Sequence, residues 1–476
     1  MLFNTLAYAV FFGVVFVVAW LLSGSVRLRL WFLLLASYYF YANWDPRFLA
    51  LIWGSSTVDW LLGNAIDAAP TQRRRKQWLA FTVVMNLGVL ALFKYFDFGV
   101  AELSALLRSL GVNPPELALR LTLPVGISFF TFESMSYVID VYRRQLRPHK
   151  SYVEYLTFVA FFPHLVAGPI IRPRDLLPQL SAAPRFSGEA ASGALLLIAI
   201  GLLKKVAIAD YLAVNLVDRV FDAPLQYSAL ECYVALVGYS VQIYCDFSGY
   251  TDIAIGSAAL LGIHFPANFA SPYKAHSIVD FWRRWHISLS TWLRDYLYIP
   301  LGGNRYGRWR TYFNLLITML LGGLWHGANL TFVVWGALHG LMLAGTRAFQ
   351  ELFGKRGAPE PASPTAGLRL LQVFLTFHAV TFAWLFFRAK SLEDAWLILG
   401  RLATLSTFHP NLDPRVLWVL AAGLVSHYVP ERWFQRALAV FANLPVPAQA
   451  VVLLVCALSV REMATLEAVP FVYFQF

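Results

Sequence analysis

The hydrophobic residues of this chain gather in long continuous runs, separated by short polar segments. The runs lie near 6–22, 30–42, 48–66, 78–98, 121–142, 152–171, 191–216, 229–261, 311–349, 366–388, 414–428 and 447–460. A membrane helix needs about 20 apolar residues, so two of the runs are long enough for a helix pair. The pattern predicts an all-α polytopic membrane protein with roughly 11–14 membrane helices. Runs that are short or interrupted by Pro and Gly are typical of re-entrant helices buried in protein.

The composition supports a membrane protein and excludes several other classes. Of the 476 residues, 58% are hydrophobic and 14% are charged, whereas soluble proteins carry roughly 45–50% and about 25%. Disordered, collagen-like and disulfide-rich chains are excluded by the same figures. No long polar stretch could form a soluble domain, so we expect one integral-membrane domain over 1–476. Cys232, Cys245 and Cys456 lie in apolar surroundings without the spacing of a metal site, so no metal is expected.

The net charge of +11 is better explained by cytoplasmic loops than by nucleic-acid binding, because such loops retain Lys and Arg. Basic clusters at 27–29, 73–76 and 143–150 follow the first, third and fifth runs, whereas 43–47 and 99–120 are poor in Lys and Arg. This asymmetry predicts an N-terminus outside the cell membrane. The first run lacks a basic flank and a cleavage site, so we expect a retained helix and no cleavable signal peptide. The segment 354–365 reads as a flexible linker, and no internal repeat is evident.

The stretch 281–300 combines aromatic and basic residues at helical spacing. At about 100° per residue, one face of the predicted helix carries Trp282, Trp285, Leu289, Trp292 and Tyr296. A second face carries Arg283, Ser290 and Arg294, and His286 lies between the two. One interpretation is an interfacial amphipathic helix with its guanidinium groups among lipid headgroups. The other is a cytoplasmic site where the arginines bind a phosphate-bearing donor.

His326 lies inside an apolar run and is flanked by Trp325 and by Gly322, Gly323 and Gly327. An ionisable residue at membrane depth is costly and is therefore a functional candidate. Histidine suits proton transfer near neutral pH. The alternative is a buried histidine satisfied by a carbonyl group. Further histidines in apolar runs, without equal support from local spacing, are His164, His339 and His378.

Polar residues also interrupt the apolar segment 241–256, at Gln242, Asp246, Ser248, Thr251 and Asp252. They predict a polar network or a water-filled cavity. Asp246 and Asp252 are six positions apart and do not share a helical face, so a paired-carboxylate mechanism is weakly supported. Glu133 and Tyr137, at i and i+4, form a second predicted buried polar pair. Hydrogen bonding between helices is the favoured interpretation for all of them.

Five segments together carry a resemblance to a known family: 161–172, 246–252, 282–294, 301–305 and 325–327. They resemble the membrane-bound O-acyltransferase (MBOAT) family, above all its bacterial branch that acetylates alginate and related exopolysaccharides. The resemblance implies helices around a central chamber that connects the two faces of the bacterial inner membrane. It also implies an acyl donor that arrives from the cytoplasm, with acetyl-CoA as donor substrate and no tightly bound cofactor.

The resemblance also assigns roles to residues. The membrane histidine of the family falls on His326, which would act as general base, and the second, more variable polar position falls on His286. His286 would orient the donor or stabilise the developing oxyanion. The donor would be steered by Arg283, Arg284 and Arg294.

The chain ends in the pattern Phe471-x-Tyr473-x-x-Phe476. It is similar to a C-terminal motif of bacterial acyl-export systems, in which the tyrosine is proposed to carry the acyl group. An interfacial aromatic belt is the alternative. The resemblance implies as partners a periplasmic esterase-like acetyltransferase subunit, the polysaccharide secretion machinery and membrane lipid, with no nucleic acid.

Several functions remain open at this point. Alginate and cellulose are equally plausible polymers, followed by peptidoglycan O-acetylation and then D-alanyl transfer to teichoic acid. Outside acyl transfer, a polytopic chain with buried acids and broken helices could be a transporter or a non-catalytic scaffold of a secretion complex.

Overall fold

The computed structural model describes residues 1–115, 118–166, 168–353, 365–464 and 469–474. These residues form helices joined by turns and loops, and no strand occurs among them, as the hydrophobic runs predict. The predicted linker 354–365 lies outside the described residues except for Thr365. Positions 475 and 476 of the C-terminal pattern also lie outside them.

The chain divides into two compact units, Met1–Ala191 with Ser257–Pro266, and Ser192–Gly256 with Ala267–Phe476. From the N-terminus to the point where the chain passes into the second unit, the helices are α1 (Leu6–Leu21), α2 (Val26–Ala42), α3 (Phe48–Ala68), α4 (Gln72–Lys94), α5 (Phe96–Ser109), α6 (Ile127–Tyr142), α7 (Tyr152–Ala160), α8 (Phe162–Leu165), α9 (Pro173–Leu180) and α10 (Gly188–Leu202). They are followed by η1 (Leu203–Asp210), η2 (Ala213–Val217), α11 (Asp218–Asp222), η3 (Pro224–Gln226), α12 (Ala229–Leu260), η4 (Pro272–Lys274), α13 (Ile278–Arg284), α14 (Ile287–Leu293) and η5 (Arg294–Tyr298). The remainder are α15 (Arg308–His326), α16 (Leu330–Phe353), α17 (Ala366–Arg388), α18 (Leu392–Ala403), α19 (Pro414–Tyr428), α20 (Glu431–Ala442), α21 (Val446–Met463) and η6 (Val472–Phe474).

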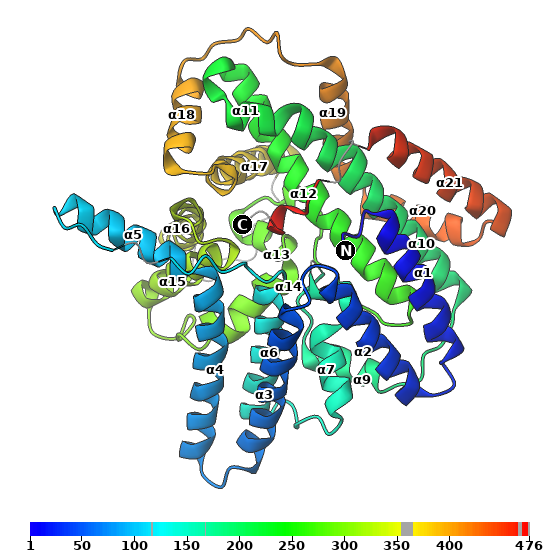
Figure 1. Cartoon of the computed structure of the whole chain (residues 1–476). Helices are drawn as coiled ribbons and strands as arrows, with labels where there is room; N and C mark the ends of the chain where they lie inside the picture. Colours follow the sequence, from blue (N-terminus) through cyan, green and yellow to red (C-terminus); the bar gives the residue numbers. More distant parts are fainter. Residues whose placement is uncertain (116–117, 167, 354–364, 465–468, 475–476) are drawn as a thin grey trace. The chain divides into compact units, whose positions relative to one another are not determined.

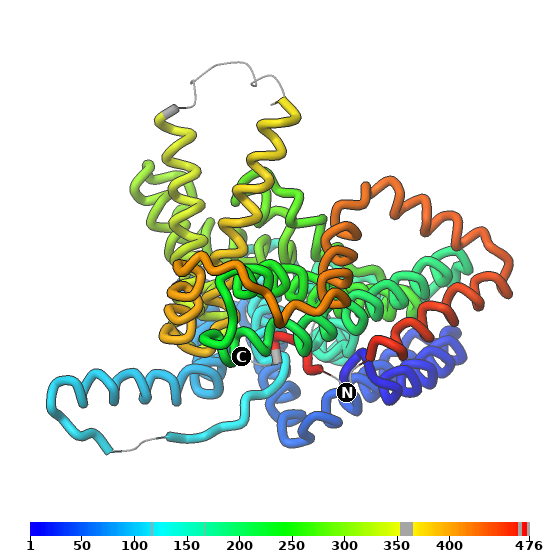
Figure 2. Tube along the Cα trace, turned by 90° about the horizontal axis from the view of Figure 1, so that it is seen from above, coloured from blue at the N-terminus to red at the C-terminus, as the bar shows by residue number. Residues whose placement is uncertain are grey.

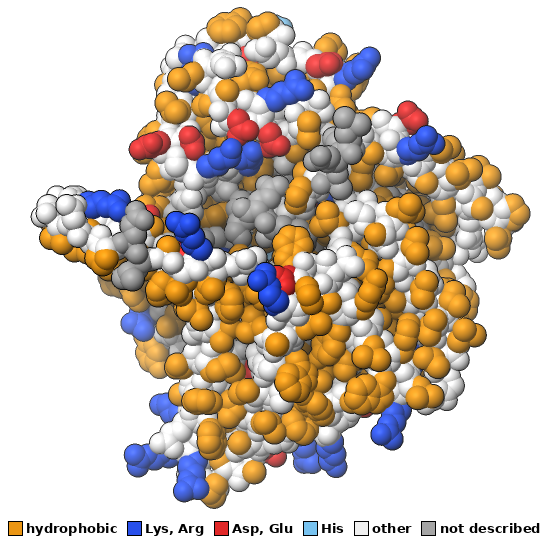
Figure 3. Space-filling model, in the orientation of Figure 1, with side chains coloured by type: hydrophobic (Ala, Val, Ile, Leu, Met, Phe, Trp, Pro, Cys, Tyr) orange, Lys and Arg blue, Asp and Glu red, His pale blue; other side chains and the backbone are white. Residues whose placement is uncertain are grey.

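In the first unit, α3, α4 and α6 pack against one another (Figure 1). Their interior is partly polar, because the buried carboxylate of Asp59 accepts hydrogen bonds from Asn86 at 2.9 and 3.0 Å and from Thr82. The outer surface of α3 and α4 is largely apolar (Figure 3). An apolar exterior over a satisfied polar interior is the arrangement that a lipid environment demands.

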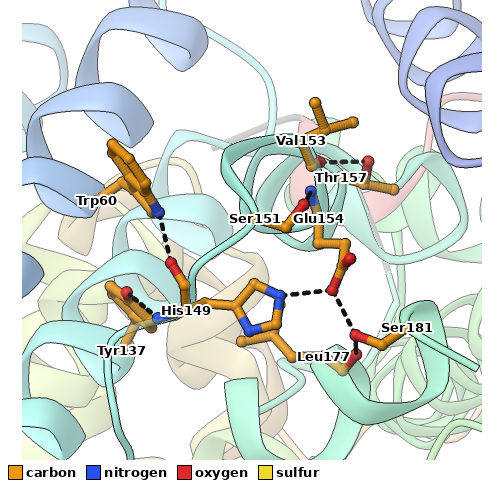
Figure 4. A network of polar contacts seen from close by, with 9 residues as sticks. All are labelled: Trp60, Tyr137, His149, Ser151, Val153, Glu154, Thr157, Leu177 and Ser181. Carbon is orange, nitrogen blue, oxygen red and sulfur yellow. Dashed lines mark hydrogen bonds and ion pairs between the residues drawn. The ribbon is translucent and has the colours of Figure 1, made fainter. Parts of the chain in front are cut away.

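A polar network fixes the segment between α6 and α7 in the same unit (Figure 4). The indole N–H of Trp60 donates to the carbonyl of His149 at 2.9 Å, and the His149 N–H donates to the Tyr137 hydroxyl at 3.0 Å. The His149 ring contacts the Glu154 carboxylate at 2.5 Å, and Ser181 donates to that carboxylate. The basic loop before α7 is therefore held to α3, α6 and α9.

Five helical segments of the described residues are long and apolar enough to cross a membrane: Gln72–Lys94, Gly188–Asp222, Leu330–Leu352, Ala366–Arg388 and Val446–Met463. The apolar helix Leu6–Leu21 is shorter. The protein is thus a multi-pass membrane protein, whereas the number 11–14 and the single domain over 1–476 stay predictions.

The two longest hydrophobic runs behave differently. The run 229–261 is not a helix pair but the single helix α12 of 32 residues. At about 1.5 Å per residue it is about 48 Å long, which exceeds the hydrocarbon thickness of about 30 Å. The run 311–349 is a pair, because the chain turns at 327–329 between α15 and α16.

The α15–α16 pair depends on close backbone contact in the second unit (Figure 2). A Cβ atom placed on Gly336 would lie 2.5 Å from the carbonyl oxygen of Met319, and one placed on Gly323 would overlap the carbonyl oxygen of Phe332. Small residues at such positions let two membrane helices approach closely. The glycines beside His326 therefore set the helix spacing at the turn.

Candidate active site

His326 is the last residue of α15 and is 4% exposed. Aromatic rings surround it, with ring centroids at 5.0 Å for Trp325, 5.1 Å for Trp335 and 5.2 Å for Phe387. They come from α15, α16 and α17, so the α15–α16 turn and the end of α17 enclose the imidazole. This burial would exclude water from a reaction at His326.

The predicted continuous helix through 281–300 is wrong, because the chain breaks at Trp285 and His286 between α13 and α14. The break has a long-range cause. The Ala270 N–H donates to the carbonyl of Arg284 at 3.0 Å, and the Ile287 N–H donates to the carbonyl of Asn268 at 2.9 Å. The segment 268–270 thus satisfies backbone groups that a continuous helix would have paired internally.

The break holds His286 in a left-handed conformation, with φ +42° and ψ 56°. Such a conformation costs about 1–3 kcal/mol for a residue other than glycine. The Asn268 side chain compensates, because its Oδ1 accepts from the Ser288 N–H at 3.1 Å and from the Ser288 hydroxyl at 2.9 Å, and lies 3.3 Å from His286 Nδ1. Among the described residues, Nε2 of this fully buried ring has no hydrogen-bond partner. This nitrogen is therefore available to a ligand or a water molecule.

Tyr473, in the C-terminal tail, lies beside both histidines in the second unit. Its ring centroid is 5.3 Å from that of His326 and 6.3 Å from that of His286. The ring also contacts Phe247 of α12 at 4.6 Å and Phe471 at 5.2 Å. All three residues named as catalytic candidates from the sequence are therefore brought together. Their catalytic roles stay predictions.

The three arginines named as donor-binding candidates are not equivalent. Arg283 is exposed, at the end of α13. Arg284 is bound within the protein, to Asp280 at 2.8 Å and to the carbonyl of Ala270 at 3.1 Å. Arg294 is exposed and pairs with its neighbour Asp295 at 2.6 Å. Arg283 thus has the greatest freedom to meet a phosphate group.

The other histidines have partners elsewhere. His339 Nδ1 accepts from the indole of Trp282 at 3.2 Å, and His378 lies 2.8 Å from the Tyr233 hydroxyl. In the first unit, His164 contacts the buried carboxylate of Glu133 at 2.9 Å.

Glu133 and Tyr137 are both buried, as predicted, and each hydrogen-bonds to another segment of the first unit. Glu133 accepts from the Ile171 N–H at 3.1 Å, whereas Tyr137 accepts from the backbone of His149. The spacing i, i+4 places two residues on one helix face, but the loops packed against that face decide their partners.

The polar residues of α12 join lysines of the π-helical segment η1. Lys204 Nζ lies 2.7 Å from Asp252, and Lys205 Nζ lies 2.6 Å from Asp246. Neither lysine was a candidate, nor was Asn268. The two lysines could have been found from the sequence, because a lysine inside an apolar run is unusual. Nothing in the local sequence marks Asn268. Among the described residues, no three or more His, Cys, Asp or Glu side chains gather as metal ligands.

The geometry places two imidazoles and one phenol within an aromatic cluster. A neutral imidazole can accept the proton of a hydroxyl that attacks a carbonyl carbon. A second imidazole whose Nδ1 proton faces an amide oxygen can orient the donor by accepting a hydrogen bond at Nε2. This arrangement suits acyl transfer to a hydroxyl group.

Comparison with known proteins agrees with this chemistry. Residues 127–388 match the model of the membrane-bound O-acyltransferase family. The chain is 44% identical to a probable alginate O-acetylase of Pseudomonas aeruginosa, over 86% of this chain and 76% of the relative. It is 38% identical over the full length of both chains to a probable alginate O-acetylase of Pseudomonas putida. It is also 37% identical to a peptidoglycan O-acetyltransferase of Helicobacter pylori, over 78% and 73% of the two chains.

Proposed function

The chain belongs to the membrane-bound O-acyltransferase family and is an O-acyltransferase, and from this premise we propose that it moves acetyl groups across the bacterial inner membrane for O-acetylation of a secreted polysaccharide. The donor is acetyl-CoA, taken from the cytoplasm, and the acceptor polymer is of the alginate type. The names of two relatives support alginate over cellulose.

One observation carries the proposal: the ring of Tyr473 lies 5.3 Å from that of His326 and 6.3 Å from that of His286. In the first step the Tyr473 oxygen attacks the thioester carbonyl carbon, and His326 accepts the phenolic proton. The C–S bond then breaks, an acetyl ester forms on Tyr473, and the proton passes to the sulfur of CoA. Because its Nδ1 lies 3.3 Å from the Asn268 oxygen, a neutral His286 carries its proton on Nδ1 and presents Nε2 as a hydrogen-bond acceptor that orients the donor during this step.

In the second step the acetyl ester on Tyr473 is transferred to a hydroxyl of the polymer by a periplasmic esterase-like subunit. The ester C–O bond breaks, and the phenol recovers its proton. Two transfers through a covalent intermediate replace one direct crossing of the membrane, which divides the reaction into two smaller barriers.

At the cytoplasmic side, Arg283 contributes most to donor binding because it is exposed, whereas Arg284 and Arg294 pair with acidic neighbours. The positive charge attracts the phosphates of CoA. Arg284 mainly holds α13 against 268–270.

Intact mass spectrometry of the detergent-purified protein after incubation with acetyl-CoA tests the relay. We expect a gain of one acetyl group in the unmodified sequence and none in the Tyr473→Phe and His326→Ala variants. The His339→Ala variant is the matched control, because that histidine is also buried among aromatic rings but does not touch Tyr473. Acetylation that persists in Tyr473→Phe would show that another residue accepts the acetyl group. Acetylation that persists in His326→Ala would show that His326 is not the general base.

The polymer is tested by NMR of the polysaccharides and of the peptidoglycan from cells that lack the protein. We expect loss of acetyl groups from the secreted polysaccharide only. Loss of acetyl groups from peptidoglycan or cellulose would show that the proposed acceptor is wrong. Loss of D-alanine from teichoic acid would show that both the proposed acceptor and the proposed donor are wrong.

A further inference from the structure

A buried cluster of charges lies where η1 meets α12 in the second unit. Lys205 is 1% exposed, and its Nζ lies 2.7 Å from Asp210 and 2.6 Å from Asp246. Lys205 and Asp210 are five positions apart, which in an α-helix would separate them by about 140°. The π-helical hydrogen bonding of η1 brings i and i+5 closer to one face. The π segment therefore lets one lysine serve two carboxylates.

The C-terminal tail, defined here as the described residues 469–474, is bound to this cluster through its backbone. The second oxygen of Asp246, Oδ2, accepts a hydrogen bond from the Val472 N–H at 2.7 Å. Lys205 Nζ lies 3.5 Å from the carbonyl oxygen of Pro470. A carboxylate and an ammonium group thus hold an N–H and a C=O of the same short segment.

The pattern of hydrogen-bond partners explains why the tail belongs in this position. Lys205 contacts Oδ1 of Asp210 and Oδ1 of Asp246, so Oδ2 of Asp246 needs another donor. A buried carboxylate oxygen without a partner is costly, and hydrogen bonds to charged groups are stronger than neutral ones. The Val472 N–H supplies the missing partner for Asp246.

Aromatic stacking fixes the Tyr473 ring relative to the tail backbone that the cluster holds. Phe471 is fully buried and stacks on Tyr250 of α12 with centroids 4.6 Å apart and an interplanar angle of 21°. Tyr473 stacks in turn on Phe471 at 5.2 Å and 20°. The spacing Phe-x-Tyr thus places two rings on one side of the tail, and the Val472 N–H between them is the point of attachment.

We propose that Lys205 and Asp246 are positioning residues that hold the backbone of the C-terminal tail and thereby set Tyr473 against His326. This inference rests on the proposed acetyl relay through Tyr473. Neither side chain touches the reacting atoms. They act by fixing residues 470 and 472, which lie on either side of the stacked Phe471.

The backbone hydrogen bond is tested by Val472→Pro, which removes the N–H. Proline is well tolerated at the first residue of a helix, and Val472 begins the short helix η6. The matched control is Val472→Ala, which keeps the N–H. The carboxylate is tested by Asp246→Asn, with Asp252→Asn as its control, because Asp252 lies on the same helix and pairs with Lys204 without touching the tail.

Two readouts are taken from the full-length protein with acetyl-CoA as the probe. The first is the ratio of acetyl-Tyr473 formed to CoA released. We expect this ratio to fall about tenfold to a hundredfold in Val472→Pro and Asp246→Asn, because water replaces the phenol at His326. Val472→Ala and Asp252→Asn should keep the ratio within about twofold. A merely structural loss would lower both products together and leave the ratio unchanged, which would overturn the proposal.

The second readout is cleavage of the tail after Tyr473 by chymotrypsin, which accepts proline at the preceding position 472, followed by intact mass. We expect the tail to be protected in the unmodified sequence and in both controls, and to be digested in Val472→Pro and Asp246→Asn. Equal digestion of Val472→Pro and Val472→Ala would overturn the proposal. If the unmodified protein gains no acetyl group while Val472→Pro still exposes the tail, the proposed acetyl relay through Tyr473 is refuted. The proposed hold of Lys205 and Asp246 on the tail is then still supported.

Discussion

Replacing Gly336 by alanine is expected to reduce acyl transfer far more than it reduces stability. A Cβ at this position would lie 2.5 Å from the Met319 carbonyl oxygen and 3.1 Å from the Leu320 Cα. Both contacts are with backbone atoms of α15, so a change of side-chain rotamer cannot relieve the overlap. To reach ordinary contact at 3.4 Å, α15 and α16 must separate by about 0.9 Å.

The energetic cost of that separation follows from general experience with overpacked interiors. Overpacking costs about 1–3 kcal/mol, and alanine recovers about 0.5–1 kcal/mol of helix stability relative to glycine. The net loss of unfolding free energy is therefore about 2.5 kcal/mol or less. The rate is more sensitive, because a displacement of about 1 Å at a reacting group can cost about a hundredfold. His326 ends the helix that must move.

The matched control is Gly345→Ala, farther along α16, where nothing lies within 4 Å of a Cβ atom. This variant should keep the full rate and gain up to about 1 kcal/mol of stability. The measurements are the thermal unfolding midpoint of the detergent-purified protein and the initial rate of acetylation with acetyl-CoA. If Gly336→Ala retains a rate within about twofold of Gly345→Ala, the spacing of α15 and α16 does not position His326.

Three further outcomes can be checked. Asn268→Ala should lower the free energy of unfolding by about 1–3 kcal/mol, because the buried Ser288 N–H loses its acceptor; thermal melts test this, and an unchanged midpoint would contradict it. Glu231→Ala should cost about 1–2 kcal/mol in the same assay, since this carboxylate accepts from two backbone N–H groups at the start of α12 and in the loop before α19; a loss below about 0.5 kcal/mol would refute the role. Arg283→Ala should raise the KM for acetyl-CoA severalfold without changing the melting midpoint, whereas Arg284→Ala should lower the midpoint; the reverse pattern would exchange their roles.

Much of the helical architecture was predictable from local features. The hydrophobic runs predicted an all-helical membrane protein, and the length of the run 311–349 allowed for a helix pair, which α15 and α16 form. His326 could be named because an ionisable side chain in an apolar run is unusual whatever its neighbours are. The resemblance in short motifs named His286 and Tyr473.

Other features could not be read from local sequence. The break at His286 arises because 268–270 supplies hydrogen bonds to both sides of it, and Asn268 lies 20 residues from Ser288. Helical periodicity measures only which residues share a face, so it predicts an unbroken helix through this stretch. The length of α12 was missed for a related reason, because hydropathy cannot separate one long helix from two short ones.

The chain by itself determined which segments are apolar enough to enter a membrane and which side chains there carry chemistry. Hydropathy depends only on neighbouring positions, and the chemistry of a side chain depends only on its own residue type. The tertiary structure alone decided how those side chains meet. Val472 and Asp246 are 226 residues apart in the chain, and their hydrogen bond places Tyr473 beside His326. Such contacts form only after distant helices have packed, because a buried carboxylate takes whichever donor the fold brings to it.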